Sequence, residues 1–254
     1  MLNSRLGSRM ESRLSPRRGA GGGGSGSNYV PITNNLVLWL DASDLGTITE
    51  SSGSVSNWAD KSGNGYDAIQ GVGSLQPTTG ATTQNGLNVI DFDGGDEFGT
   101  DAGLNSLTNG PSTIFFVARR NTETGSSERM ISLFEAGVQN NLILTFSATA
   151  GQILFVNRPG TAINIANNGN TNTNFQIVRA RRSGTTQALA VDGGTEASNT
   201  SAQDAPTTDG GRIGSNAGSN FLNGSICEIL IYDVSLTVNE RTAVETYLGN
   251  KWGV

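Results

Sequence analysis

The sequence predicts an all-β protein, an antiparallel β-sandwich that ends in one short helix. Its 254 residues include 35 glycines, and only 15% are charged, as expected of many short strands joined by turns. Apolar and polar residues alternate in short stretches separated by Gly, Asn and Ser, which indicates strands. A helix-capping signal lies close to the C-terminal end.

The stretch Gly224–Tyr232 is the clearest predicted strand. Ile226, Glu228, Leu230 and Tyr232 alternate with Cys227, Ile229 and Ile231, which is the period of two of a β-strand. Because both faces are apolar, the strand should lie inside a sheet that is covered on both sides. The only cysteine, Cys227, should be a buried and inert thiol.

A short helix is predicted directly after this strand. The segment Thr237-Val238-Asn239-Glu240 is a capping box, in which the Thr237 hydroxyl and the Glu240 carboxylate each accept a backbone N–H. Gly249 should end the helix, and Trp252 should close the edge of the core. The buried face should consist of residues at helical spacing, Val244, Tyr247 and Leu248.

Further strands are predicted upstream. They are Leu36–Leu40, Thr113–Arg120, Arg129–Glu135, Leu142–Ala148, Gln152–Asn157, Phe175–Arg182 and Thr186–Asp192, the last two forming a hairpin around Ser183-Gly184. Two tryptophans, Trp39 and Trp58, could stack on sugars, but their apolar surroundings favour a place in the core.

Several short motifs occur in the order found in one known superfamily. They are Leu36–Asp41, Trp58–Gly65, Ile90–Gly94, Val191–Gly193, Arg212–Gly214 and the final strand and helix. With these motifs the chain resembles the LamG-like, concanavalin A-like lectin and glucanase superfamily over roughly residues 29–254, and we place the domain at 28–254. The resemblance implies an antiparallel β-sandwich of the jelly-roll type for this range, and it implies much less about function.

An N-terminal arm and a linker precede this domain. Residues 1–18 repeat every four residues, so a helix would align one apolar and one basic stripe, made by Leu2, Leu6, Met10 and Leu14 and by Arg5, Arg9, Arg13 and Arg17. Residues 19–27 read as a flexible Gly/Ser linker. We favour a docking arm over an organelle transit peptide or an inert tail. The absence of an apolar run after the arginines argues against a secretory signal.

The arm and the rest of the chain, here the body, also differ in net charge. Of its 16 basic and 22 acidic residues, the arm holds five arginines and one glutamate, so the body is strongly acidic. An acidic body should repel nucleic acid and anionic membranes, whereas the arm should seek an acidic partner. The chain contains no histidine, which excludes every catalytic or metal-binding role that needs an imidazole.

Two acidic segments are candidates for chemistry. Asp60–Asp67 resembles the first half of a calcium loop, but Gly71 stands where the bidentate glutamate belongs, so we favour a plain turn and expect no cofactor. Asp91–Glu97 gathers four carboxylates. The chain contains no E-x-D-x-x-E pattern, which retaining glycosidases of this superfamily carry, and we therefore expect a structural role and no enzymatic activity.

Two polar segments leave binding open. Arg179, Arg181 and Arg182 could bind an acidic sugar or a phosphate, although a solvated strand near a sheet edge is the simpler interpretation. Asn164–Asn174 could be a sugar-binding loop, because amides suit hydroxyl pairs, or an ordinary polar surface loop. No particular glycan-binding residue follows from the sequence.

Three function classes compete on this basis. The favoured one is a non-enzymatic structural protein of a bacteriophage virion, a capsid decoration or tail appendage, since jelly rolls of this kind resemble those found on virions. It would be present in many copies, attach to capsid or tail proteins through residues 1–18, be displayed on the virion surface, and bind glycans there. A free-standing lectin-like module is the alternative. A glycan hydrolase is the third.

Overall fold

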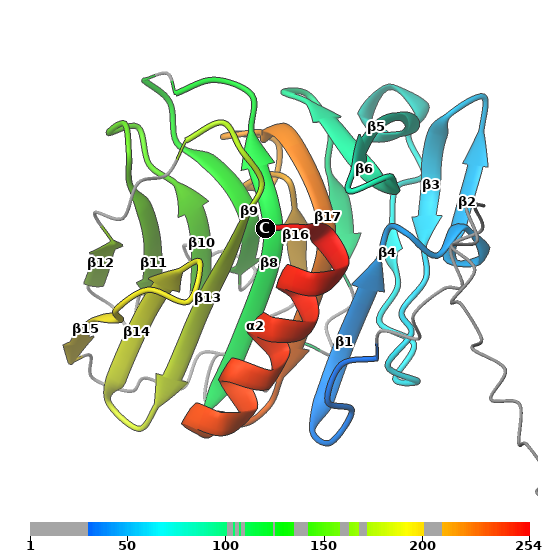
Figure 1. Ribbon diagram of the computed structural model, residues 1–254. Coiled ribbons are helices and arrows are strands. Elements are labelled where there is room, and N and C mark those ends of the chain that lie inside the picture. Colours follow the sequence, from blue (N-terminus) through cyan, green and yellow to red (C-terminus); the bar gives the residue numbers. More distant parts are fainter. Residues whose placement is uncertain are drawn as a thin grey trace, which may run out of the picture.

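The computed structural model describes residues 30–100, 104, 107, 110–123, 125–134, 142–157, 163–167, 172–200 and 210–254. All strand pairs within this part of the chain are antiparallel, and they build a β-sandwich with a long C-terminal α-helix on its outside (Figure 1). The all-β fold class predicted from the sequence is confirmed.

One layer, here the helix-side sheet, is centred on β17 (Asn223–Tyr232). Its first half pairs with β6 and its second half with β1, so these two strands share one edge of β17. From the other edge the order continues through β8, β13, β14 and β15. The bounds of these strands are β1 Leu36–Asp41, β6 Leu87–Asp93, β8 Ser112–Arg120, β13 Gln176–Ser183, β14 Thr186–Val191 and β15 Ala197–Thr200.

The opposite sheet has the order β7, β16, β9, β10, β11, β12. Short strands at one side connect the two layers, because β5 pairs with β6 and β4 pairs with β7. The bounds are β2 Ile48–Ser51, β3 Ser54–Trp58, β4 Ala68–Ile69, β5 Thr78–Gln84, β7 Phe98–Thr100, β9 Glu128–Phe134, β10 Leu142–Phe146, β11 Ile153–Asn157, β12 Ile163–Asn167 and β16 Gly210–Ile213.

Two apolar clusters hold the layers together. The larger lies between the sheets and contains Trp58, Phe92, Phe98 and Phe116. The smaller lies between the outer face of the helix-side sheet and the helix α2 (Val238–Trp252), and it contains Trp252. Each fully buried large side chain contributes about 1.5–3 kcal/mol to stability, so both clusters matter to the fold.

The alternation predicted for β17 is interrupted by a bulge. Cys227 is the extra residue between the pairs Ile226 with Ala118 and Glu228 with Val117. Ile226 therefore faces the space between the sheets, while Cys227 and Glu228 both face α2. Burial raises the pKa of the Cys227 thiol well above its usual range, in agreement with the prediction of an inert side chain.

The helix begins as predicted and ends later than predicted. Both bonds of the Thr237–Glu240 capping box are present. Gly249 does not end the helix, which continues through Trp252 and stops at Gly253 with φ 68° and ψ 40°. That left-handed conformation favours glycine, so Gly253 is the end signal. Val244, Tyr247, Leu248 and Trp252 are buried, as the spacing predicted.

Candidate functional site

The arm residues selected from the sequence, Leu2 to Arg17, lie outside the described part of the chain, as does the linker 19–27. Nothing in the structure tests their role in docking. The described residues contain no helix with the length and apolar character needed to cross a membrane.

The Asp60–Asp67 segment is a turn bonded to β1. Asp60 accepts hydrogen bonds from the Trp39 and Tyr66 N–H groups and from the Ser62 hydroxyl. The Asn64 amide donates to the carbonyl of Val37 at 3.1 Å. Both oxygens of Asp60 thus accept hydrogen bonds from protein donors. In the described part of the chain, no three Cys, Asp or Glu side chains are grouped as metal ligands.

The acidic segment Asp91–Glu97 is bonded to several elements. The Asp91 carboxylate accepts the Ser225 hydroxyl at 2.7 Å. Glu97 accepts Arg212 at 3.2 Å and also the Ser215 hydroxyl. Burial and the neighbouring Asp93 carboxylate raise the pKa of Asp96 to about 6, although a bond from the Asp93 N–H opposes this rise. These contacts stabilise the turn, as the structural interpretation of the sequence expected.

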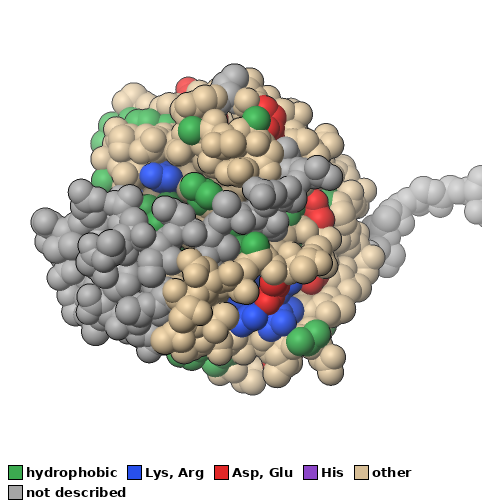
Figure 2. Space-filling model, turned by 90° about the vertical axis from the view of Figure 1, so that its left-hand side faces the viewer, with side chains coloured by type: hydrophobic (Ala, Val, Ile, Leu, Met, Phe, Trp, Pro, Cys, Tyr) green, Lys and Arg blue, Asp and Glu red, His purple; other side chains and the backbone are tan. Residues whose placement is uncertain are grey.

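Arg179 and Arg181 of β13 are paired with acids. Arg179 bonds Glu196 and also Glu245, the latter at 2.7 Å, and Arg181 bonds Glu196 at 2.6 Å. Basic and acidic side chains adjoin on the face of the molecule that bears β14 and β15 (Figure 2). Hydrogen bonds from Arg181 hold the pKa of Glu196 down at about 2, despite partial burial. Arg179 and Arg182 are buried, and β13 lies between β8 and β14, so the predicted solvated strand near a sheet edge is wrong for these two residues.

The polar segment Asn164–Asn174 begins in a strand. Residues Ile163–Asn167 form β12, which pairs with β11 through Ile165 and Phe155. The alternation of Ile163 and Ile165 with polar residues is the strand signal that its many asparagines concealed. Among its last residues, Thr173 and Asn174 are exposed and line a hollow described below.

A buried ion-pair network joins α2 to the helix-side sheet. Glu228 accepts hydrogen bonds from Trp39 at 2.7 Å, Tyr247 at 2.5 Å, Lys251 at 2.8 Å and Trp252 at 2.7 Å. All four partners are donors, which the ionised carboxylate satisfies, although burial raises the pKa of Glu228 above its usual range. The network places both tryptophans in the core, as predicted for Trp39, and it fixes α2 on the sheet.

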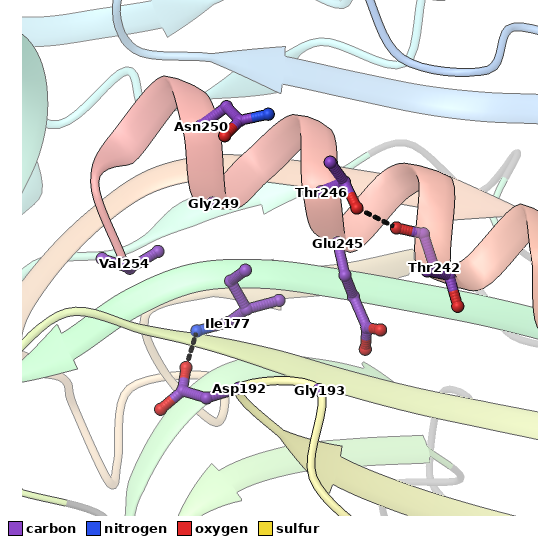
Figure 3. Close-up of a pocket in the computed structure, with 9 residues that line it drawn as sticks. All are labelled: Ile177, Asp192, Gly193, Thr242, Glu245, Thr246, Gly249, Asn250 and Val254. Carbon is purple, nitrogen blue, oxygen red and sulfur yellow. Dashed lines mark hydrogen bonds between the residues drawn. The ribbon is translucent and has the colours of Figure 1, made fainter.

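The opposite side of α2 borders an open hollow of about 480 Å³, here the helix hollow (Figure 3). Glu245 extends from the helix toward the turn at Asp192 and Gly193, while Asn250 points away from it. Asp192 accepts the Ile177 N–H at 2.8 Å and the Gln176 amide at 3.0 Å. The hydroxyl-bearing residues of this wall are Thr242 and Thr246.

A second hollow, of about 400 Å³, adjoins the first at Val254, which lines both. We call it the arginine hollow. Its walls come from the end of β5, the end of β8, the segment before β13 and the end of the helix. The residues that line it are Thr83, Gln84, Arg119, Thr173, Asn174, Phe175, Gly253 and Val254.

Arg119 is the residue in this region that sequence reasoning missed. It belongs to the predicted strand Thr113–Arg120, where alternation places it on the same face as Phe115 and Val117. These two residues face α2. An arginine at an alternating position on an otherwise apolar strand face is the signal that could have identified it. Its partners come from residues 83–84, 173–175 and 253–254, whose proximity no local pattern reveals.

No family model matches this chain, and no curated protein sequence matches it significantly. Among solved structures, the Trypanosoma rangeli sialidase in complex with the inhibitor DANA has a TM-score of 0.60 at 16% identity. The match covers 85% of this chain and 33% of the sialidase chain.

The binding domain of botulinum neurotoxin DC is similar as well. Its structure in complex with SialylT has a TM-score of 0.59 at 9% identity, and the match covers 85% of this chain and 52% of that one. The same domain in complex with rat synaptotagmin II has a TM-score of 0.57, with equal identity and coverage. This chain therefore spans about a third to a half of the solved chains. At such identities the likeness shows a shared fold.

Proposed function

We propose that residues 28–254 form a lectin-like carbohydrate-binding module that binds without catalysis. The observation that carries this proposal is the pair of adjoining polar hollows, of about 480 and 400 Å³, along the end of α2. A sugar is bound through many hydroxyl groups, each of which both donates and accepts. Threonine hydroxyls, amides and carboxylates line these two hollows, as such a ligand requires.

The comparison with known structures agrees with this proposal. A toxin binding domain with a related fold was solved with SialylT, and we transfer from it only the idea that such a sandwich can present a carbohydrate site. The position of the site comes from the hollows of this chain, since fold alone does not locate function.

The absence of catalysis is also part of the proposal. Glycosidases use two carboxyl groups, one of which donates a proton while the other attacks or activates water. In the helix hollow, Asp192 is bonded by an N–H and an amide, and Glu245 is bonded by Arg179. Both carboxylates, which line the hollow, thus accept hydrogen bonds from other protein groups.

The test is a glycan array probed with the full chain and two tryptophan variants. Thr246→Trp places a large ring in the helix hollow, and Ala243→Trp adds the same ring at an exposed helix position outside it. We expect the wild type and Ala243→Trp to bind the same glycans and Thr246→Trp to lose them. Silence of the folded wild type across the array would overturn the proposal. Release of reducing sugar from a bound glycan would replace it with an enzyme.

Attachment to a virion is a separate proposal, and the four-residue repeat of the arm favours it. The body would then be displayed in many copies on the particle surface, where weak glycan binding adds up through multivalency. Deletion of residues 1–27 should leave a folded domain that no longer joins particles. Unchanged incorporation of the truncated chain would remove this proposal without affecting the carbohydrate site.

A further inference from the structure

Arg119 is held in one orientation at the wall of the arginine hollow. Its Nε donates to the Ser225 hydroxyl at 3.4 Å, and its guanidinium carbon lies 4.8 Å from the centre of the Phe175 ring. Phe175 is buried, so the ring is a fixed surface on which the planar guanidinium rests. The half-buried side chain is therefore ordered before any ligand arrives.

This guanidinium has no direct counter-ion among the described residues. No carboxylate of the described part of the chain lies within 4.0 Å of it, whereas Arg179, Arg181 and Arg212 each have such a partner. Asp91 is connected to Arg119 only through Ser225, whose hydroxyl accepts from Arg119 and donates to the Asp91 carboxylate. The hollow thus offers a positive charge on a strongly acidic body.

The other side chains of the wall carry no charge, and several of them are polar. Thr83, Thr173 and Asn174 are exposed at the hollow, where their hydroxyl and amide groups can exchange hydrogen bonds with sugar hydroxyls. Gln84 is fixed by a bond of 2.8 Å from its amide to the Trp252 carbonyl. One cationic fork beside several neutral polar groups matches a ligand with one negative charge and several hydroxyls.

We propose that the arginine hollow selects sugars that carry a carboxylate, with Arg119 pairing the carboxylate and the neutral wall contacting the hydroxyls. This inference rests on the proposed carbohydrate-binding function and names its ligand class. Guanidinium groups bind carboxylates through two parallel N–H bonds, which are about twice as strong as neutral ones. A neutral sugar leaves the guanidinium unpaired and should bind more weakly.

The experiment compares sugars that differ only in this charge. The probes are uronic acid oligosaccharides and sialylated glycans, each paired with the methyl ester of its own carboxylate, titrated against the full chain. We expect the wild type to bind each acid about tenfold more tightly than its neutral counterpart at physiological ionic strength. The difference should shrink in about 1 M salt, because screening weakens the pair.

Three variants separate charge selection from sugar binding. Arg119→Gln should bind acids and neutral sugars equally, and Arg119→Lys should keep a reduced preference because it retains charge without the fork. Thr173→Ala should weaken both classes alike and leave their ratio unchanged. Thermal unfolding of each variant confirms folding.

The outcomes also distinguish this inference from the function beneath it. Equal affinity of the wild type for acids and their neutral counterparts would overturn the inference while the lectin proposal stands, and so would an acid preference that survives in Arg119→Gln. Absence of binding to any glycan would remove both.

Discussion

Replacement of Glu228 by glutamine tests whether the buried network fixes α2 to the sheet. The carboxylate is fully buried and accepts four hydrogen bonds, including those from Lys251 and Trp252. A glutamine of the same shape keeps one acceptor oxygen and places an NH₂ group against two of these donors. The variant therefore leaves two donors without their acceptor oxygen and removes one of the two carboxylates paired with the Lys251 ammonium.

The expected magnitude follows from these losses. Each buried donor left without a partner costs about 1–3 kcal/mol, and breaking one side of a buried ion pair costs about 3–5 kcal/mol. Lys251 keeps a second partner, since Asp41 lies 2.7 Å from its Nζ, which limits the damage. We expect Glu228→Gln to lower the free energy of unfolding by about 3–5 kcal/mol.

The assay is equilibrium unfolding in urea followed by tryptophan fluorescence. The signal is well placed, because Trp39 and Trp252 both donate to Glu228. Asp233→Asn is the control, since it removes one negative charge from an exposed residue and should change stability by less than about 0.5 kcal/mol. If Glu228→Gln unfolds within that margin of the wild type, the network does not stabilise the fold and the reasoning fails.

Three further predictions concern pH and packing. The pKa of Asp96 in the folded protein, about 6, is above its ordinary value of 3.8. The stabilisation that protonated Asp96 provides is therefore complete below pH 3.8 and is lost as the pH rises through 6. In unfolding experiments across this pH range, the free energy of unfolding of the wild type should increase relative to that of Asp96→Asn as the pH falls. The pKa of Glu196 in the folded protein, about 2, is below its ordinary value of 4.5. In the same experiments, the loss in free energy of unfolding caused by Glu196→Gln should be largest above pH 4.5 and should shrink toward pH 2. A loss that does not change with pH contradicts the pairing of Glu196 with the arginines. A Cβ at Gly224 would lie 2.1 Å from the Arg119 carbonyl oxygen, so calorimetry should show Gly224→Ala losing about 1–3 kcal/mol or more, while Gly71→Ala, with open space around it, should unfold like the wild type.

The elements that the sequence predicted best are those specified by local chemistry. The Thr237–Glu240 capping box set the start of α2, and the alternating residues of Gly224–Tyr232 identified β17, because both signals act within a few residues. The end of α2 was misplaced, since a glycine inside a helix and one just beyond it look alike until the left-handed φ of Gly253 is known.

The candidate site could not be predicted in the same way. The arginine hollow joins β5, β8, the residues before β13 and the end of α2, and such proximity follows from strand order and not from any local pattern. The bulge at Cys227 escaped prediction for a related reason: an extra residue in an apolar strand leaves its composition unchanged and alters only its pairing.

The position of α2 also bears on the rate and the entropic cost of the proposed carbohydrate binding. One side of the helix is bonded to the sheet through Lys251 and Trp252, and the other side supplies a wall of the helix hollow. A surface built on an immobilised element loses little further entropy when a ligand arrives. Association should then resemble docking to a rigid surface, and differences in affinity among ligands should come mainly from their dissociation rate constants.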